Sequence, residues 1–178
     1  MQQIPLYNRA QRSLFTLVDD EDYEVFSHYR WRLNSKGYVI RSYSGADKEI
    51  IVALHREIMQ PAAKLVVDHI DHNTLNNTRA NLRVISQQLN LMNRRMFKSN
   101  STGFKGVTYQ HEKWHARIEK DGIDIHLGYH VDLKAAALIY DCAATLLFGA
   151  SYVWRNLPDQ VIPPEIEALV REYLERAG

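Results

Sequence analysis

The residues with the clearest capacity for chemistry lie between positions 68 and 90. Asp68 and His69 are adjacent, Asn81 follows in an Asn-Leu-Arg segment, and Asn90 lies further along the chain. A histidine can take a proton from water, while a carboxylate and an amide oxygen can hold a hard divalent cation on a phosphate group. This combination indicates a metal-dependent attack on a phosphodiester bond.

Short apolar segments around these residues predict a hairpin that is followed by a helix. Residues 64–67 form a short run that is apolar after Lys64, and residues 82–85 form the returning strand. The stretch between them is rich in Asp and Asn, which build turns with their own side chains. Ser86 is a suitable N-cap for a helix that runs to about residue 95. We therefore expect Asn90 one turn into this helix, facing the hairpin.

The stretch 55–95 resembles the HNH endonuclease family, whose members have a ββα-metal fold. The Asp-His pair, the Asn-Leu-Arg segment and the helix asparagine all fall at the spacing of that family. The resemblance implies that His69 is the general base and that Asp68 and Asn90 are ligands of Mg²⁺ or Mn²⁺. It also implies that Asn81 fixes the hairpin or orients the histidine ring.

Each of these residues also has an ordinary structural interpretation. His69 could be a satisfied core histidine, and Asn93 competes with Asn90 for the same place on the helix. His55 fits the upstream pattern of the family, but its role stays open. The remaining polar residues are more typical of turns and solvated loops: Asp71, His72, Asn73, Asn76 and Asn77. Asp68, His69, Asn81 and Asn90 taken together, at this spacing, favour a nuclease-type site.

Length and composition limit the class of protein. A chain of 178 residues can form one large domain or two small ones. No apolar run approaches the length of a membrane span and no signal segment is evident, so we expect a cytoplasmic protein of a bacterium or phage-infected host. The single cysteine, Cys142, excludes an intrachain disulfide and paired-cysteine zinc sites, so no zinc is expected. No heptad run supports an obligate protein partner, and we expect a monomer.

The net charge is only +1, but the basic residues are unevenly distributed. Nine of them lie between positions 79 and 120 against two acids, Glu112 and Glu119, which gives that stretch a net charge of +7. Acidic residues gather at 19–22 and in the C-terminal tail. The alternative is a charged face that only contacts solvent. Because the basic stretch directly follows the histidine motif in the sequence, contacts with phosphates are favoured. The first candidates for contacts with DNA phosphates are Arg94, Arg95 and Lys98.

Composition and turn signals divide the chain into three parts. These are a unit with the histidine motif at 1–98, a second unit at 99–157, and an amphipathic C-terminal helix at 158–178. In the first unit we expect a strand at 14–18, a short helix at 23–29 and two further strands at 37–43 and 49–54. This region can add DNA contacts through Arg30, Arg32 and Arg41.

The second unit has a pattern of three strands and a helix. The strands are expected at 106–110, 113–120 and 123–130, with an Asp-Gly hairpin signal between the last two. A helix is expected at 133–148, with Asp132 as its N-cap and Gly149 as its stop. The pattern predicts a three-stranded antiparallel sheet packed on one helix, and the whole chain is expected to be an α+β protein.

This second unit resembles the ethylene-response-factor (Apetala-type) DNA-binding domain. The matching segments are Gly103-Phe104-Lys105-Gly106-Val107, Trp114-His115-Ala116-Arg117-Ile118, Leu127-Gly128-Tyr129 and Tyr140-Asp141-Cys142-Ala143-Ala144. In that family the sheet lies in the major groove of DNA and the helix braces its back. Alternation along the middle strand then places His115, Arg117 and Glu119 on the DNA side.

The resemblance also implies which residues contact DNA. The candidates are Lys105, Thr108, Gln110, Arg117 and His126. The plant domains have arginines where Thr108 and Gln110 stand and a tryptophan where His126 stands. The base preference of the family therefore does not carry over to this chain.

Together the two resemblances imply a metal-dependent DNA endonuclease of the HNH homing type, phage-like, that binds double-stranded DNA through its second unit. A rival interpretation is a sequence-specific DNA-binding regulator with a degenerate nuclease fold. A third is an RNA-binding accessory protein, although no aromatic stacking motif for single strands is evident. The intact set of Asp68, His69, Asn81 and Asn90 favours the enzyme, because nothing in a pure binder requires it.

Overall fold

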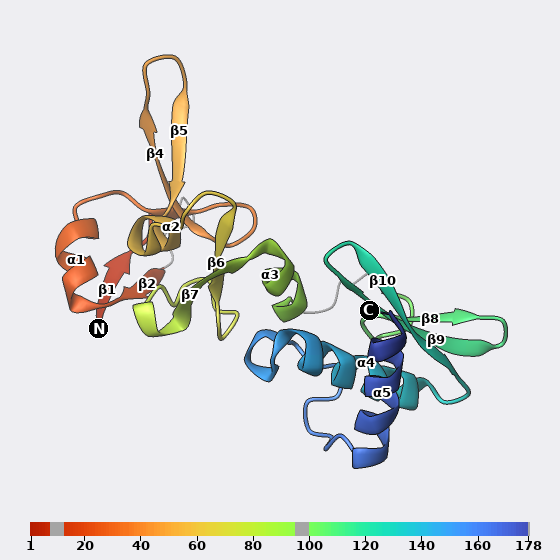
Figure 1. Ribbon diagram of the computed structural model, residues 1–178. Helices are drawn as coiled ribbons and strands as arrows, with labels where there is room; N and C mark the ends of the chain where they lie inside the picture. Colours follow the sequence, from red (N-terminus) through yellow and green to blue (C-terminus); the bar gives the residue numbers. More distant parts are fainter. Residues whose placement is uncertain (8–12, 95–99, 178) are drawn as a thin grey trace. The chain divides into compact units, whose positions relative to one another are not determined.

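The computed structural model describes residues 1–7, 13–94 and 100–177, and the chain divides into two compact units (Figure 1). The first unit is Met1–Gln87 and the second is Gln88–Gly178. The units therefore divide within the helix that follows the histidine motif, earlier in the chain than the boundary expected at residue 98. Arg95 and Lys98, two of the predicted DNA contacts, lie outside the described residues.

The described part of the first unit is built from short strands in three small antiparallel sheets. β1 (Gln2–Pro5) pairs with β2 (Phe15–Val18), and β6 (Leu65–His69) pairs with β7 (Leu82–Ser86). The third sheet has the order β3 (Arg32–Leu33), β4 (Val39–Ser44) and β5 (Glu49–Ala53). Two helices, α1 (Asp20–Phe26) and α2 (Leu54–Met59), and the 3-10 turn η1 (Arg79–Asn81) lie between these strands.

Helix α1 begins earlier than the helix expected at 23–29. Asp20, Glu21 and Asp22 occupy its first turn, where carboxylates stabilise the positive end of the helix dipole. The acidic run therefore starts the helix instead of preceding it. Residue Leu54, expected at the end of a strand, instead begins α2.

A buried core fixes the hairpin of β6 and β7 to the rest of the first unit. Trp31 and Leu54 are completely buried in this core. Val67 of β6 and Leu82 of β7 belong to the same cluster. Full burial of one such aliphatic side chain is worth roughly 1.5–3 kcal/mol, so the hairpin is held by its apolar face.

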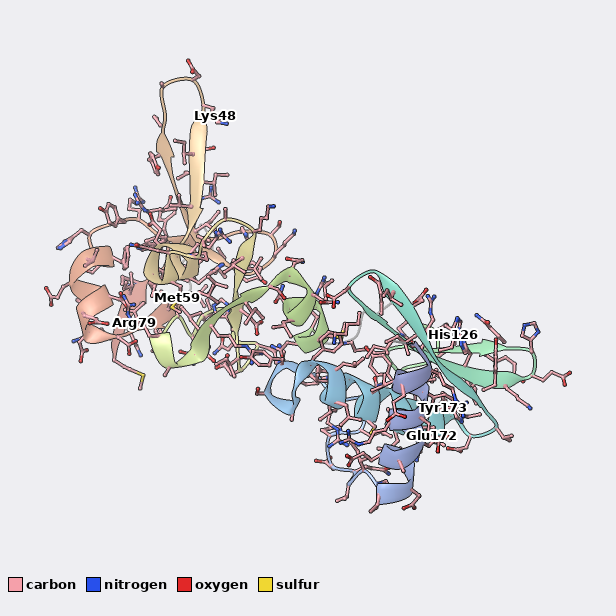
Figure 2. All side chains as sticks on the ribbon, in the orientation of Figure 1. Lys48, Met59, Arg79, His126, Glu172 and Tyr173 are labelled. Atoms are coloured by element: carbon pink, nitrogen blue, oxygen red, sulfur yellow. The ribbon has the colours of Figure 1, made fainter. Side chains whose placement is uncertain are left out.

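The loop between β6 and β7 is also tied to distant parts of the first unit. The backbone N–H of Asn77 donates to the carbonyl of Leu17, at 2.9 Å. Arg79, labelled in Figure 2, reaches Asp22 at 2.7 Å and Glu21 at 2.8 Å. Arg79 belongs to the basic stretch of the sequence, but its charge is balanced by Glu21 and Asp22 within the first unit.

The second unit begins with most of α3 (Gln87–Asn93) and contains a three-stranded antiparallel sheet. The sheet has the order β10 (Ile123–His130), β9 (Lys113–Lys120) and β8 (Val107–Gln110). It is followed by α4 (Leu133–Phe148), the 3-10 turn η2 (Ala150–Tyr152) and α5 (Pro164–Ala177). The expected strands and the helix at 133–148 are confirmed, and Asp132 caps α4 by accepting from the N–H of Ala135 at 2.7 Å.

Helix α4 packs on the sheet, and α5 adds a second helix to the same core. Ala116 of β9, Leu127 of β10 and Val170 of α5 are fully buried in one cluster. Gly128 makes room for α5, because a Cβ there would lie 2.6 Å from the hydroxyl of Tyr173. The sheet therefore packs on two helices where one was expected. In the described ranges, no helix has both the length and the apolar character needed to cross a membrane.

Candidate active site

Asp68 and His69 lie at the end of β6, on a hairpin whose register is continuous. Asp68 is opposite Arg83 and His69 is opposite Leu82 on β7. Neighbouring residues of a strand point to opposite faces, so the two side chains have different surroundings. Both are buried, with exposed fractions of 8% for Asp68 and 4% for His69.

The imidazole of His69 is oriented by Asn77, which the sequence indicated only as a turn residue. The Nε2 atom of His69 lies 3.3 Å from Oδ1 of Asn77, and both side chains are buried. The Nδ2 atom of Asn77 donates to Oγ1 of Thr16 at 2.8 Å and to the carbonyl of Thr74 at 3.1 Å. These two bonds fix the amide so that its oxygen faces the ring.

This arrangement selects one tautomer of His69. An amide oxygen can only accept a hydrogen bond, so Nε2 of the ring must carry the proton that it donates. The lone pair of the neutral ring is then on Nδ1, which is the atom able to accept a proton. Burial lowers the pKa of His69, against the opposing effects of the Asn77 bond and the charges of Asp68 and Asp71. The ring is therefore neutral at neutral pH, as a general base requires.

His55 and Tyr38 enclose the same ring. The ring centroids of His55 and His69 are 5.2 Å apart with an interplanar angle of 72°, and the ring of Tyr38 lies 6.0 Å from that of His69. His55 is buried, and its Nδ1 atom has no hydrogen-bond partner among the described residues. Burial lowers the pKa of His55 to about 4, and the charges of His69 and Arg56 act in the same direction. His55 is thus a second neutral imidazole against the first.

Asp68 is paired with Arg83 across the hairpin. The Nε and Nη2 atoms of Arg83 lie 2.9 Å and 2.8 Å from Oδ2 of Asp68. The guanidinium balances the charge of a carboxylate that has little contact with water. In the sequence Arg83 stands out only as part of the Asn-Leu-Arg segment, and its position opposite Asp68 follows from the hairpin register.

Asn81 braces the loop rather than the ring of His69. Its Nδ2 atom donates to Oδ1 of Asp71 at 2.9 Å and to the carbonyl of Asn76 at 2.8 Å. Its Oδ1 atom accepts from the backbone N–H of Asp71 at 3.0 Å. Asn81 therefore closes the Asp- and Asn-rich loop, while the contact with His69 comes from Asn77.

Asn90 lies on α3 and belongs to the second unit, whereas Asp68 and His69 belong to the first. Asn90 is half-buried, and its competitor Asn93 is buried. No cluster of three or more His, Cys, Asp or Glu side chains suited to a metal occurs in the described ranges. One carboxylate and one amide oxygen still fit Mg²⁺ by donor type, because this ion keeps several waters and takes substrate phosphates as ligands.

The predicted DNA contacts of the second unit do not share one environment. Thr108, Gln110, Arg117 and His126 lie on the sheet face away from α4, and Arg117 is opposite His126 in the register of β9 and β10. The guanidinium of Arg117 is 3.3 Å from Asp124, so it must exchange this partner to bind a phosphate. His115, expected on the same face, is buried beneath neighbouring rings, with its centroid 4.6 Å from that of Tyr129.

Lys105, the remaining predicted DNA contact of the second unit, does not lie on this face of the sheet. Its Nζ atom donates to backbone carbonyls at the end of α3. The ammonium is therefore engaged within the second unit. Arg94 is exposed, and its carbonyl is one of these acceptors.

Comparison with known proteins places the histidine motif in a described family. A family model described as HNH endonuclease matches residues 60–92, which include Asp68, His69, Asn81 and Asn90. An uncharacterized HNH endonuclease of Acanthamoeba polyphaga mimivirus is 33% identical over 141 residues, which is 78% of this chain and 73% of that protein. Protein 3.8 of Escherichia phage T7 is 33% identical over 76 residues, which is 42% of this chain and 63% of that protein. No solved structure matches the chain.

Proposed function

The chain belongs to the HNH endonuclease family, and we propose that it hydrolyses phosphodiester bonds of double-stranded DNA with His69 as the general base. The orientation of the His69 ring supports this role. Asn77 holds the proton on Nε2, and the lowered pKa of His69 leaves Nδ1 unprotonated at neutral pH. A neutral imidazole with one fixed tautomer can accept a proton from water as the water attacks phosphorus.

Asp68 and Asn90 are the proposed ligands of a Mg²⁺ or Mn²⁺ ion. When bound, the ion would stabilise the charge that develops on the phosphate and on the leaving 3′ oxygen. Arg83 would orient the Asp68 carboxylate through Oδ2. Asn81 would hold the loop that follows His69 in its bound shape.

The sheet of the second unit is the proposed surface for sequence-dependent contact with DNA. Thr108, Gln110, Arg117 and His126 share its outer face, and a ribbon of strands fits the major groove. Arg94, together with Arg95 and Lys98, would add phosphate contacts that are independent of sequence. Lys105 is left out of this surface, because its ammonium binds the end of α3. A nuclease site followed by a separate DNA-binding unit fits a homing-type enzyme of phage origin.

A DNA-binding regulator with an inactive nuclease site is the alternative. It is favoured by the ion pair of Asp68 and Arg83, because a metal ligand that is already neutralised binds a cation less strongly. The two functions differ in one observable property. A regulator binds DNA without cutting it at any concentration of divalent metal.

Incubation with DNA decides between them. Supercoiled plasmid and phage genomic DNA are incubated with the protein in Mg²⁺ or Mn²⁺, beside the variants His69→Ala and His28→Ala. His28 is exposed on the first unit and serves as the matched control. We expect cutting by the wild type and by His28→Ala, and none by His69→Ala, with DNA binding nearly unchanged in all three. Cutting by His69→Ala would exclude it as the base.

A further inference from the structure

Helix α3, which carries Asn90, has its C-terminal end held by a lysine of the second unit. The last carbonyls of a helix have no partner within the helix. The Nζ atom of Lys105 donates to the carbonyls of Met92 at 2.8 Å, Arg94 at 3.1 Å and Leu91 at 3.4 Å. A positive charge at this end of a helix is also favoured by the helix dipole.

The lysine is itself fixed from both sides of its backbone. Its N–H donates to Oδ1 of Asn156 at 2.7 Å, and its carbonyl accepts from Nδ2 of Asn156 at 3.2 Å. The N–H of Asn156 donates in turn to Oδ1 of Asp141 at 2.8 Å, and Asp141 is completely buried on α4. A continuous chain of hydrogen bonds therefore connects the centre of α4 to the end of α3.

Two further contacts hold α3 against the same unit. The backbone N–H of Trp154 donates to the carbonyl of Met92 at 3.1 Å. Near the start of the helix, the side-chain amide of Gln88 faces Asp121 in the turn between β9 and β10. Turned over, so that its N and O exchange places, this amide would donate to Oδ1 of Asp121 at 3.1 Å and accept from the N–H of Asp121 at 2.8 Å. The end of this short helix is thus bound to elements of the second unit, and its start lies against the β9–β10 turn.

We propose that Lys105 is a positioning residue for metal binding, because it fixes the helix that presents Asn90. This inference rests on the proposed role of Asn90 as a metal ligand. It assigns contacts within the second unit a task besides DNA contact, which is to fix the helix that carries Asn90. The ammonium of Lys105 is partly buried, and its three carbonyl partners replace water that it would otherwise bind.

The test compares Lys105→Met with Lys113→Met in the full chain. Lys113 is exposed at the start of β9 and is the matched control. Two quantities are measured: hydrogen–deuterium exchange of the amides of α3, and the Mn²⁺ concentration that gives half-maximal DNA cutting. For Lys105→Met we expect faster exchange in α3 and a Mn²⁺ requirement raised roughly tenfold. Lys113→Met should change neither, and Lys105→Arg should restore part of the loss.

Each result has a defined meaning. Unchanged exchange in α3 would overturn the anchoring role of Lys105. Faster exchange with an unchanged Mn²⁺ requirement would show a structural contact only, and the proposed function would stand.

If the wild type cuts no DNA, the proposed function fails by itself, and Mn²⁺ binding in the presence of DNA is then measured by electron paramagnetic resonance. Equal Mn²⁺ affinities of wild type and Lys105→Met in that assay would overturn the inference. If Lys105→Met does not fold, Lys105→Gln replaces it, because the amide removes the charge and keeps an N–H donor for the carbonyls of α3.

Discussion

The amide oxygen of Asn77 faces Nε2 of His69 at 3.3 Å, and the amide cannot turn without losing its bonds to Thr16 and Thr74. The tautomer of the proposed base is therefore set by Asn77, whose amide is held in turn by Thr16 of β2, far from it in the chain. Thr16 also donates to the carbonyl of Leu75 at 2.8 Å, which fixes its hydroxyl as an acceptor for Asn77. The imidazole of His69 is oriented by a chain of three polar groups rather than by one contact.

Asn77→Ala should lower the cutting rate without weakening DNA binding. The ring of His69 would lose the acceptor that keeps its proton on Nε2, and we expect a loss of roughly tenfold to a hundredfold, which is part of what acid–base catalysis contributes. Loss of the buried amide should also cost about 1–3 kcal/mol of stability. Single-turnover cutting and urea unfolding measure the two effects. Asn73→Ala, an exposed change in the same loop, is the control, and an equal loss in both variants would contradict the assigned role of Asn77.

Arg83→Met should destabilise the protein and make its stability depend on divalent metal. The change removes the guanidinium that lies against the buried Asp68 carboxylate, which we expect to cost about 3–5 kcal/mol. Mg²⁺ can then replace the missing charge, so the melting temperature should rise more with Mg²⁺ for the variant than for the wild type. Thermal unfolding with and without Mg²⁺ tests this.

The control for Arg83→Met is Arg171→Met, which breaks an exposed ion pair with Glu167 on α5. That variant should lose little stability and gain no response to Mg²⁺. If Mg²⁺ leaves the melting temperature of Arg83→Met unchanged, Asp68 is not a ligand in the absence of DNA.

His55 should make the folded protein sensitive to acid. The unfolded chain takes up this proton near pH 6.5 and the folded protein only near pH 4, so protonation favours unfolding in between. The free energy of unfolding is thus complete above pH 6.5 and falls as the pH drops towards 4, by roughly 3 kcal/mol at most. Urea unfolding at several pH values should show a shallower fall for His55→Phe than for the wild type. The exposed variant His28→Phe should follow the wild type, and identical curves for all three would refute the assignment to His55.

Gly106→Ala should cost more stability than Gly122→Ala. Both glycines have a positive φ, +68° and +81°, so both substitutions carry backbone strain. A Cβ at Gly106 would in addition lie 2.0 Å from the ring of Tyr140 and 2.7 Å from the carbonyl of Arg117, whereas nothing lies within 4 Å at Gly122. We expect a difference of about 1–3 kcal/mol in urea unfolding. Equal losses would mean that α4 can move away from the sheet at little cost.

Arg117→Ala should weaken DNA binding and reduce its dependence on salt. If Arg117 contacts one phosphate, the slope of log affinity against log salt should fall by about 1. Titrations at several salt concentrations measure this slope. Lys134→Ala, an exposed change on α4, should leave it unchanged. An unchanged slope in Arg117→Ala would remove this residue from the proposed DNA surface.

Local signals in the sequence were sufficient for most elements of the second unit. The Asp-Gly turn, the N-cap Asp132 and the stop at Gly149 each act within a few residues, so the strands and α4 lie where the pattern predicted them. The hairpin with Asp68 and His69 follows for the same reason, since apolar runs and turn residues define it locally. The segment 60–92 that the HNH endonuclease model matches includes the predicted site residues Asp68, His69, Asn81 and Asn90, whose roles stay predictions.

Partners that are distant in the chain were decided by the tertiary structure alone. The sequence indicated Asn77 as a turn residue and Lys105 as a DNA contact, but packing places one on the His69 ring and the other on the carbonyls of α3. Arg79 likewise finds its counterions on α1 instead of on a phosphate. Periodicity and turn chemistry report only on neighbours in sequence, whereas the partner of a buried polar group is set by which segments the core brings together. The residues of the segment 60–92 thus indicated a nuclease. The groups that orient the His69 ring were determined by the fold.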